Sequence, residues 1–388
     1  MSRLSPFANA RRERRVPSLW QDNAGNRVSP AAAALPAQGI AVRPGPDLPA
    51  APAAQFRSWT RETPRVSVVV PACRRPSQLL QCLHALIKQD FPNADYEIIV
   101  VDDGGNPATR RVVQAVAGRS RGAPAVQYLA ANDAKGPAAA RNRGWMYARS
   151  AVIAFTDAAA VPARDWLSYG MAAMTPNIVA VSGQILAPRP ALRSLNECDT
   201  SSDTRAEFVR LNYFVHRRAL VAVGGFDERF TAAWCEDSDL HFRLIERFGG
   251  EQRIRHEAQA RVMHRTPPAG LGISFFQQRR LQFDALLHKK HPLLYRSCIR
   301  RAPRWDYYAI FAALGVTLAA AAAGQVYLTG AALVLWSLLT LRCVAQRLNG
   351  KRHTLMQFGQ MIATSVAVPP LAVFWRCVGV LRYRVLPD

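Results

Sequence analysis

Cysteine is scarce in this 388-residue sequence, and its seven cysteines are scattered. No two of them form a CxxC pair, which excludes the common zinc-site patterns and gives no sign of a disulfide framework. We therefore expect a reduced, cytosolic environment. The first residues are partly basic but lack an apolar stretch followed by a small-residue cleavage site, so we expect no secretory signal peptide.

Acidic residues are also few, since 27 Asp and Glu face 50 Lys and Arg and give a formal net charge of +23. This excess predicts attraction to an anionic partner: a nucleic acid, an anionic lipid or a phosphorylated substrate. The arginines form no recognisable nucleic-acid motif, and several of them stand beside apolar runs. We expect contact with the anionic lipid of a membrane and no nucleic-acid partner.

Residues 1–62 lack sustained hydrophobic periodicity and are rich in Ala, Pro and Arg. Such a segment buries too little apolar surface to offset the entropy of ordering it, so we predict that it is disordered. The pattern changes near Arg65, and we expect a folded domain at residues 63–295.

Short apolar runs alternate with helical patterns from Arg65 onward, as in RVSVVVPA, PSQLLQCLHALIKQ and YEIIVVDDGG. This alternation predicts an α/β fold in which helices flank a mostly parallel sheet. Ligands bind beyond the carboxyl ends of the strands in such sheets. The predicted strand ends hold Pro71, Ala72, Asp102, Asp103 and Asp157.

Three carboxylates crowd the predicted start of a helix in CEDSDLHFRL: Glu236, Asp237 and Asp239. Helix capping and the helix dipole readily explain one of them but not all three. Crowding raises the pKa of a carboxylate and suits it to take a proton from a hydroxyl nucleophile. An intrahelical ion pair between Asp239 and Arg243, four residues apart, would orient the group.

The segment ANDAKGPAAARNRG combines a loop, small side chains and a helix start with three cations, Lys135, Arg141 and Arg143. Small residues allow a ligand to approach closely, and the cations suit a diphosphate. A tightly packed alanine-rich helix explains the alanines equally well.

Charge is absent from Tyr307 to Leu341, and this run breaks at Gly324 and Gln325. One membrane-spanning helix needs about 20 apolar residues, so two short spans or one long tilted helix would fit. Basic residues flank both ends, which favours a hairpin by the positive-inside rule. We expect the hairpin at about residues 305–343, within a membrane-associated region at residues 296–388.

A further apolar segment, at about residues 355–375, contains Pro369 and Pro370 and is followed by arginines. A crossing there would carry these arginines to the opposite side of the membrane, so we expect a re-entrant or interfacial segment. The alternative is that all these apolar segments are core helices of a soluble domain. Long uncharged runs are rare in soluble folds, which disfavours that alternative.

Seven segments follow one another in a fixed order between about Arg65 and His291: VSVVVPACRRP, EIIVVDDGG, KGPAAARNRG, FTDAAAVP, VGGFDERF, EDSDLHFRL and ARVMH. In this order they resemble the family 2 glycosyltransferases with the GT-A fold. The resemblance implies a Rossmann-like domain that binds a nucleoside-diphosphate sugar and transfers the sugar to an acceptor. It also implies Mg²⁺ or Mn²⁺ at the diphosphate.

The resemblance assigns roles by position. Pro71, Ala72 and Asp103 would hold the nucleoside, and Asp157 would lie beside the ribose or a metal ion. Asp237 would be the general base of an inverting reaction, with Glu236 and Asp239 in support, and the turn at Gly225 would border the acceptor. Asp102 and Lys135, taken from the strand end and the cationic loop, complete the predicted binding residues.

The sequence departs from the family at FTDAAAVP, where Ala159 replaces the usual metal-binding Asp. A hard divalent cation prefers several oxygen ligands, and only Asp157 remains. Three explanations stay open. The metal is held by Asp157, His264, water and the sugar diphosphate; cations among Arg74, Arg75 and Lys135 replace it; or the domain has lost the site.

The sequence therefore predicts a membrane-attached inverting glycosyltransferase of envelope glycan or glycolipid synthesis. Its catalytic domain would face the cytosol at the inner membrane, and its acceptor would be lipid-linked or a glycan. The alternative is an inactive GT-A scaffold subunit of a membrane glycan-assembly complex.

Overall fold

The computed structural model describes residues 63–73, 75–119, 124–131, 133, 135–186, 212–264, 277–299, 305–348 and 355–385. All of them lie in the second of two compact units, Pro46–Asp388. The predicted disorder of residues 1–62 lies outside the described residues, and so does Arg74.

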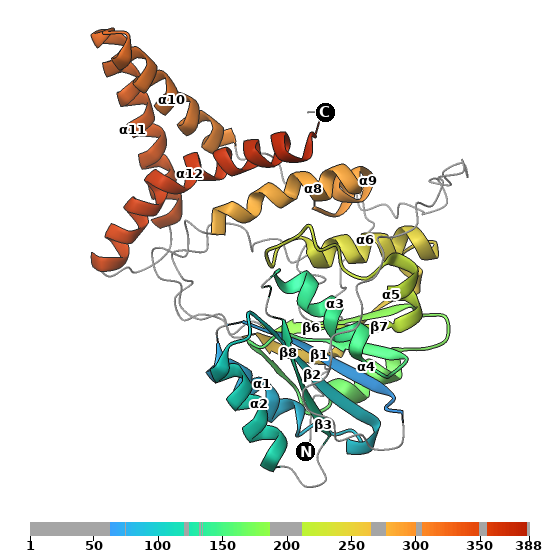
Figure 1. Ribbon diagram of the computed structural model, residues 1–388. Coiled ribbons are helices and arrows are strands. Elements are labelled where there is room, and N and C mark those ends of the chain that lie inside the picture. The colour runs from blue at the N-terminus through green and yellow to red at the C-terminus, as the bar shows by residue number, and fades with distance from the viewer. Residues whose placement is uncertain are drawn as a thin grey trace, which may run out of the picture. The chain divides into compact units, whose positions relative to one another are not determined.

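The described part of the domain is built on an eight-stranded mixed sheet in the order β3-β2-β1-β4-β7-β6-β8-β5 (Figure 1). The four strands at one end are parallel: β1 (Val66–Ala72), β2 (Tyr96–Asp103), β3 (Ala125–Ala131) and β4 (Val152–Phe155). The other strands are β5 (Ala160–Pro162), β6 (Ala180–Leu186), β7 (Tyr213–His216) and β8 (Ile254–His264). Among these, β7 is antiparallel to β4 and β6, while β6 and β8 are parallel. The predicted α/β class is confirmed.

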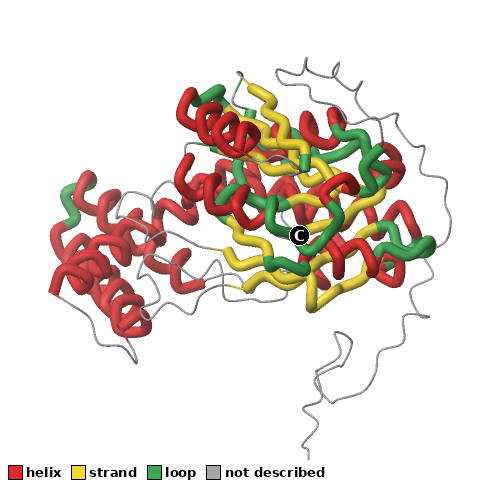
Figure 2. Tube along the Cα trace, turned by 90° about the horizontal axis from the view of Figure 1, so that it is seen from below, coloured by secondary structure: helices red, strands yellow, loops and turns green. Residues whose placement is uncertain are grey.

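Two hydrophobic clusters bury the two faces of the sheet, and Figure 2 shows helices on either side of the strands. One cluster joins the strands to α1 (Pro76–Leu86), α2 (Pro107–Arg119) and α4 (Trp166–Ala173). The other joins them to α3 (Pro137–Tyr147), α5 (Arg217–Val223) and α6 (Glu236–Phe248). Successive side chains of a strand point to opposite faces, so Val68 and Val69 enter different clusters. Burial on both faces explains the continuous apolar runs of the parallel strands.

The strand register brings the predicted ligand-binding ends to one edge. Ala72 of β1 pairs with Asp102 of β2, and Asp103 pairs with Ala131 of β3. Beside them, the N–H of Thr156, just past β4, donates to the carbonyl of Val69. The side chains at these positions therefore begin where the parallel hydrogen bonding ends, which is the usual place for a ligand in an open α/β sheet.

Helices follow the sheet. They are α8 (Gln282–Lys290), the single turn α9 (Pro292–Leu294), α10 (Trp305–Ala322), α11 (Val326–Leu348) and α12 (Leu355–Tyr383). The chain turns between α10 and α11 at Gly324, whose φ of 69° suits a residue without a Cβ. A third hydrophobic cluster joins side chains of α6, α8, α10 and α12. Within it, α8 lies between α6 and α12 (Figure 1).

Three of these helices are long and apolar enough to cross a membrane, at Trp305–Ala322, Val326–Gln346 and Met361–Tyr383. Their surfaces carry exposed large apolar side chains, among them Leu318, Val334 and Leu338. Helix α12 continues through Pro369 and Pro370 and is more buried than the other two. Its buried Val368 and Val373 belong to the cluster that includes side chains of α8.

Candidate active site

The two aspartates at the end of β2 have different surroundings. Asp102 is fully buried, and one of its carboxylate oxygens accepts the hydroxyl hydrogen of Tyr128 at 2.8 Å. Asp103 is half-buried and accepts the backbone N–H of Gly136 at 3.2 Å. Burial raises the pKa of both carboxyl groups. Of the two, Asp103 is the one that faces the loop before α3.

That loop packs closely against the segment before α6. Gly136 has φ 98°, and a Cβ there would lie 2.4 Å from the carbonyl oxygen of Thr231. Lys135, expected to face a diphosphate, is instead 3.1 Å from Asp133, which also pairs with Arg143 at 2.6 Å. In this structure the two cations are therefore held at the loop's own carboxylate.

Arg141 is the buried centre of the site. Its Nη1 lies 2.9 Å from Glu236 and 3.7 Å from Asp237, and its guanidinium sits over the ring of Phe226. Burial lowers the pKa of Arg141, but the negative charges of Asp237, Glu236 and Asp157 outweigh it and raise the pKa. The guanidinium thus stays charged beside the first turn of α6.

The neighbouring Asn142 holds in place the turn at Gly224–Asp227, called the glycine turn below. Its Oδ1 accepts the backbone N–H of Phe226 at 2.8 Å, while its Nδ2 donates to the carbonyl of Phe226 and to Glu228. Gly225 has φ 69°, and a Cβ there would lie 2.6 Å from the Asn142 oxygen. Gly225 therefore serves the packing of this turn. Sequence reasoning missed Asn142, whose only signal was its place inside ARNRG.

The three carboxylates in the first turn of α6 have different surroundings in the structure. The helix is preceded by Cys235, which makes no side-chain capping bond. Glu236 is buried against Arg141, whereas the Asp237 side chain is 14% exposed. Asp237 is thus the carboxylate of this first turn that both touches the buried guanidinium and reaches the surface.

Asp239 points away from Arg141 toward α8. It is fully buried and receives hydrogen bonds from Arg243 at 2.8 Å, from Lys290 and from His291 at 3.3 Å. The expected intrahelical pair with Arg243 is present. The pKa of Asp239 is not raised. Burial alone would raise it, but His291, Arg243 and Lys290 outweigh burial and lower this pKa. The expectation from crowding failed here because the neighbouring charges are positive.

The end of β4 is poor in carboxylates. Asp157 is half-buried, and its Oδ1 accepts the backbone N–H of Ala159 at 3.1 Å. Ala158, Ala159 and Ala160 are buried, and Ala160 pairs with His264 across β5 and β8. His264 thus lies at the same edge as Asp157. No group of three His, Cys, Asp or Glu side chains in the described part of the chain could hold a metal ion.

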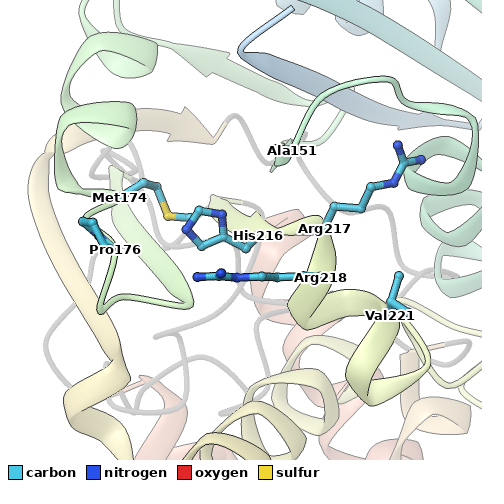
Figure 3. Close-up of a pocket in the computed structure, with 7 residues that line it drawn as sticks. All are labelled: Ala151, Met174, Pro176, His216, Arg217, Arg218 and Val221. Carbon is cyan, nitrogen blue, oxygen red and sulfur yellow. The ribbon is translucent and has the colours of Figure 1, made fainter. Parts of the chain in front are cut away.

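A surface cavity of about 720 Å³ lies elsewhere, lined by Ala151, Met174, Pro176, His216, Arg217, Arg218 and Val221 (Figure 3). Ala151 directly precedes β4, so this cavity is at the opposite end of that strand from Asp157. Arg217 turns away from His216 in Figure 3 and donates to the carbonyl of Trp145 at 2.8 Å. None of the predicted site residues line the cavity, and we do not assign the site to it.

Comparison with known proteins gives a consistent match. Residues 67–226 match the family model described as glycosyl transferase family 2. The chain is 29% identical over 124 residues to glycosyltransferase AglE of Haloferax volcanii, covering 32% of this chain and 40% of AglE. It is 28% identical over 224 residues to validoxylamine A glucosyltransferase of Streptomyces hygroscopicus subsp. limoneus, covering 48% of this chain and 49% of that protein. The chain thus spans half or less of the length of these two relatives.

A solved structure shares the fold. It is the mannosyltransferase PcManGT from Pyrobaculum calidifontis in complex with GDP-Man and Mn²⁺, with a TM-score of 0.51 and 21% identity over 80% of this chain and 88% of that chain. The GT-A fold implied by the resemblance is confirmed. The family match contains Asp103, Arg141, Asp157 and Gly225, whereas Asp237 lies just beyond it.

Proposed function

We propose that this chain, in which residues 67–226 form a family 2 glycosyltransferase domain, transfers a sugar from a nucleoside-diphosphate sugar to an acceptor hydroxyl. One observation carries the proposal. The buried Arg141 lies 3.7 Å from Asp237 at the start of α6, and the negative charge of Asp157 at the end of β4 also raises the pKa of this guanidinium. A nucleotide bound beyond the strand ends and a proton acceptor on α6 would then share one site.

The proposed reaction is a direct displacement that inverts the anomeric carbon. The oxygen of the acceptor hydroxyl attacks that carbon while the bond from the carbon to the diphosphate oxygen breaks. Asp237 takes the hydroxyl proton as general base, and the nucleoside diphosphate leaves. We assign Glu236 the task of keeping Arg141 in position beside Asp237, because their ion pair is buried and short.

On the donor side we assign the nucleoside to the ends of β1 and β2. Pro71 and Ala72 end β1, and Asp103 is the half-buried acid of the pair on β2. Asp102 supports this edge from inside through Tyr128. Lys135 would reach a diphosphate only by leaving Asp133, an exposed pair whose separation costs little.

A divalent cation is implied by the family, and the structural neighbour PcManGT was solved in complex with GDP-Man and Mn²⁺. The described residues do not form a metal site by themselves, because Asp157 and His264 are the only predicted ligands at this edge. Hard cations need more ligands than these two residues provide: Mg²⁺ takes about six, and Ca²⁺ takes about six to eight. A cation bound at this edge would therefore take most of its ligands from the diphosphate and water.

We further propose that the chain is attached to the cytoplasmic membrane, with the glycosyltransferase domain on the cytosolic side. The support is the apolar character of α10, α11 and α12. A lipid-linked or glycan acceptor fits this location, as does anionic lipid near the basic residues that flank the apolar segments. In that setting the chain would serve envelope glycan or glycolipid synthesis.

A second candidate function is a scaffold subunit that has lost catalysis. The observation in its favour is that buried alanines, Ala158 and Ala159, follow Asp157, whereas the resemblance to family 2 implies a metal-binding acid at position 159. Calorimetric titration with nucleoside diphosphates, with and without Mn²⁺, separates the two candidates. Clear binding contradicts the scaffold, and binding without Mn²⁺ favours neutralisation of the diphosphate by protein cations.

The decisive experiment uses the full chain purified in detergent. Nucleotide sugars are screened for binding, and each bound donor is then incubated with membrane lipid extract as acceptor. We expect nucleoside diphosphate to be released only when donor and acceptor are both present. Absence of binding by every donor tested would overturn the proposed activity.

A further inference from the structure

The residue before the acid-rich helix has an unusual backbone conformation. Cys235 has φ 68° and ψ −11°, the left-handed region that residues with a Cβ avoid. Among the described residues, Arg384 near the end of α12 is the one other non-glycine residue with a positive φ. Such a conformation persists only where surrounding contacts hold it, and it is enriched at functional sites. The peptide that follows Cys235 begins the turn that carries Glu236 and Asp237.

Those contacts come from α8. One oxygen of Asp284 accepts the indole N–H of Trp234 at 2.7 Å and also the thiol of Cys235 at 3.5 Å. Trp234 is 8% exposed and belongs to the hydrophobic cluster that also contains Leu286 and Leu287. Asp284 therefore binds both residues that immediately precede Glu236.

A second contact from α8 lies further along the same helix. Lys290 Nζ lies 2.6 Å from Asp227 in the glycine turn and also contacts Asp239 of α6. Asp284 contacts the two residues before α6, and Lys290 contacts Asp239, two residues after Asp237. Helix α8 therefore binds the chain on both sides of Asp237. The other side of α8 is bound to α12, where Lys289 donates to the carbonyl of Tyr383 at 2.6 Å.

We propose that Asp284 is a positioning residue of the transferase. It holds the left-handed turn at Cys235 and thereby sets the direction in which Asp237 projects beside Arg141. The proposal rests on the function proposed above for Asp237. Without Asp284, Cys235 would relax toward a negative φ, and Asp237 would rotate away from the acceptor hydroxyl. An error of about 1 Å in such a group costs roughly 100-fold in rate.

The test compares four variants of the full chain: Asp284→Ala, Asp284→Asn, and Asp284→Ala combined with either Cys235→Gly or Cys235→Ala. Turnover, the donor KM and nucleotide affinity are measured, together with hydrogen–deuterium exchange of residues 236–240. Lys289→Ala is the matched control, because it removes a contact of α8 with α12 and none with α6.

We expect Asp284→Ala to lower kcat roughly 10- to 100-fold, with the donor KM and nucleotide affinity within about twofold. Asp284→Asn keeps an acceptor oxygen and should retain most of the activity. Glycine adopts a positive φ freely, so Cys235→Gly should recover at least part of the loss. Cys235→Ala removes the same thiol but keeps the Cβ and should recover nothing. Exchange at residues 236–240 should follow the same order, with Lys289→Ala like the wild type.

Unchanged kcat in Asp284→Ala, or equal rescue by glycine and alanine, would overturn the proposal. If the wild type turns over no donor, the proposed function fails, and exchange alone decides the role of Asp284. Faster exchange in Asp284→Ala that glycine reverses would still support control of the turn. Unchanged exchange would overturn it.

Discussion

The end of β4 and the start of α6, the two acidic sides of the proposed site, are built in opposite ways. The strand end keeps one carboxylate, Asp157, followed by buried alanines, whereas the helix start has three carboxylates within four residues. The helix can hold three because cations compensate them. Arg141 pairs with Glu236, while Arg243, Lys290 and His291 surround Asp239.

The number of acidic residues in each element does not give the number of carboxylates that reach the surface. Two of the three carboxylates in the first turn of α6 are buried in ion pairs, so this turn offers the proposed site one partly exposed group, Asp237. The strand end offers one as well, Asp157. The negative charges of both Asp237 and Asp157 raise the pKa of one guanidinium, that of Arg141. The two sides therefore resemble each other more closely in their partly exposed carboxylates than in sequence.

The largest effect should follow from removing the acid of the helix side. We expect Asp237→Asn to lower turnover by roughly 10²- to 10⁴-fold, the usual contribution of a general base, with little change in nucleotide affinity. Release of nucleoside diphosphate measures it. Asp95→Asn, in a surface pair with Arg65, is the matched control. Sustained turnover by Asp237→Asn would show that the helix side does not supply the base.

The second largest effect should follow from removing the guanidinium of Arg141, which contacts Glu236 and Asp237. Arg141→Met leaves Glu236 buried without its partner, and we expect the free energy of unfolding to fall by about 3–5 kcal/mol. Adding Glu236→Gln removes the buried charge and should restore much of that loss without restoring turnover. Urea unfolding in detergent measures both variants. An equal loss in the single and double variants would contradict a buried ion pair at this position.

The third effect makes the strand side resemble the helix side. Ala159→Asp introduces the carboxylate that the resemblance to family 2 leads us to expect at this position. We expect affinity for Mn²⁺ in the presence of nucleoside diphosphate to rise roughly tenfold, because cation affinity grows with ligand charge. Ala159→Asn, which has the same shape without the charge, should gain less. Calorimetric titration compares the two. Identical affinities for both variants would mean that position 159 does not reach the cation.

Much of the fold and part of the site could be predicted from the sequence. Strand ends are local features, so the positions of Asp103 and Asp157 followed from apolar runs that stop at polar residues. The start of α6 at Glu236 followed in the same way. These predictions needed only short stretches of sequence and the rule that ligands bind beyond parallel strands.

The partners of these residues could not be predicted, because they come from distant parts of the chain. Arg141 and Glu236 are 95 positions apart, and Asn142 and Phe226 are 84 apart. The sequence grouped Arg141 with Lys135 and Arg143 as cations near a helix start that suit a diphosphate. In the structure Arg141 lies inside α3 and pairs with Glu236 of α6. Two of the cations around Asp239 likewise come from a distant part of the chain: Lys290 ends α8, and His291 follows it. The sequence of α8 shows no sign of this contact, whereas the pair with Arg243 lies within α6 and was predicted.

The smallest effect concerns the helix side alone. Burial opposes charge on His291, but hydrogen bonds to Asp239 and Glu246 outweigh it and raise its pKa. A raised folded-state pKa contributes stability that is complete below the unfolded value of about 6.5 and is lost as pH rises through the folded value. We therefore expect the wild type to lose stability above pH ~6.5, and His291→Gln to show a flatter profile. The exposed His84→Gln should keep the wild-type slope in denaturant titrations. A wild type that gains stability over this range would mean that His291 is neutral in the folded chain.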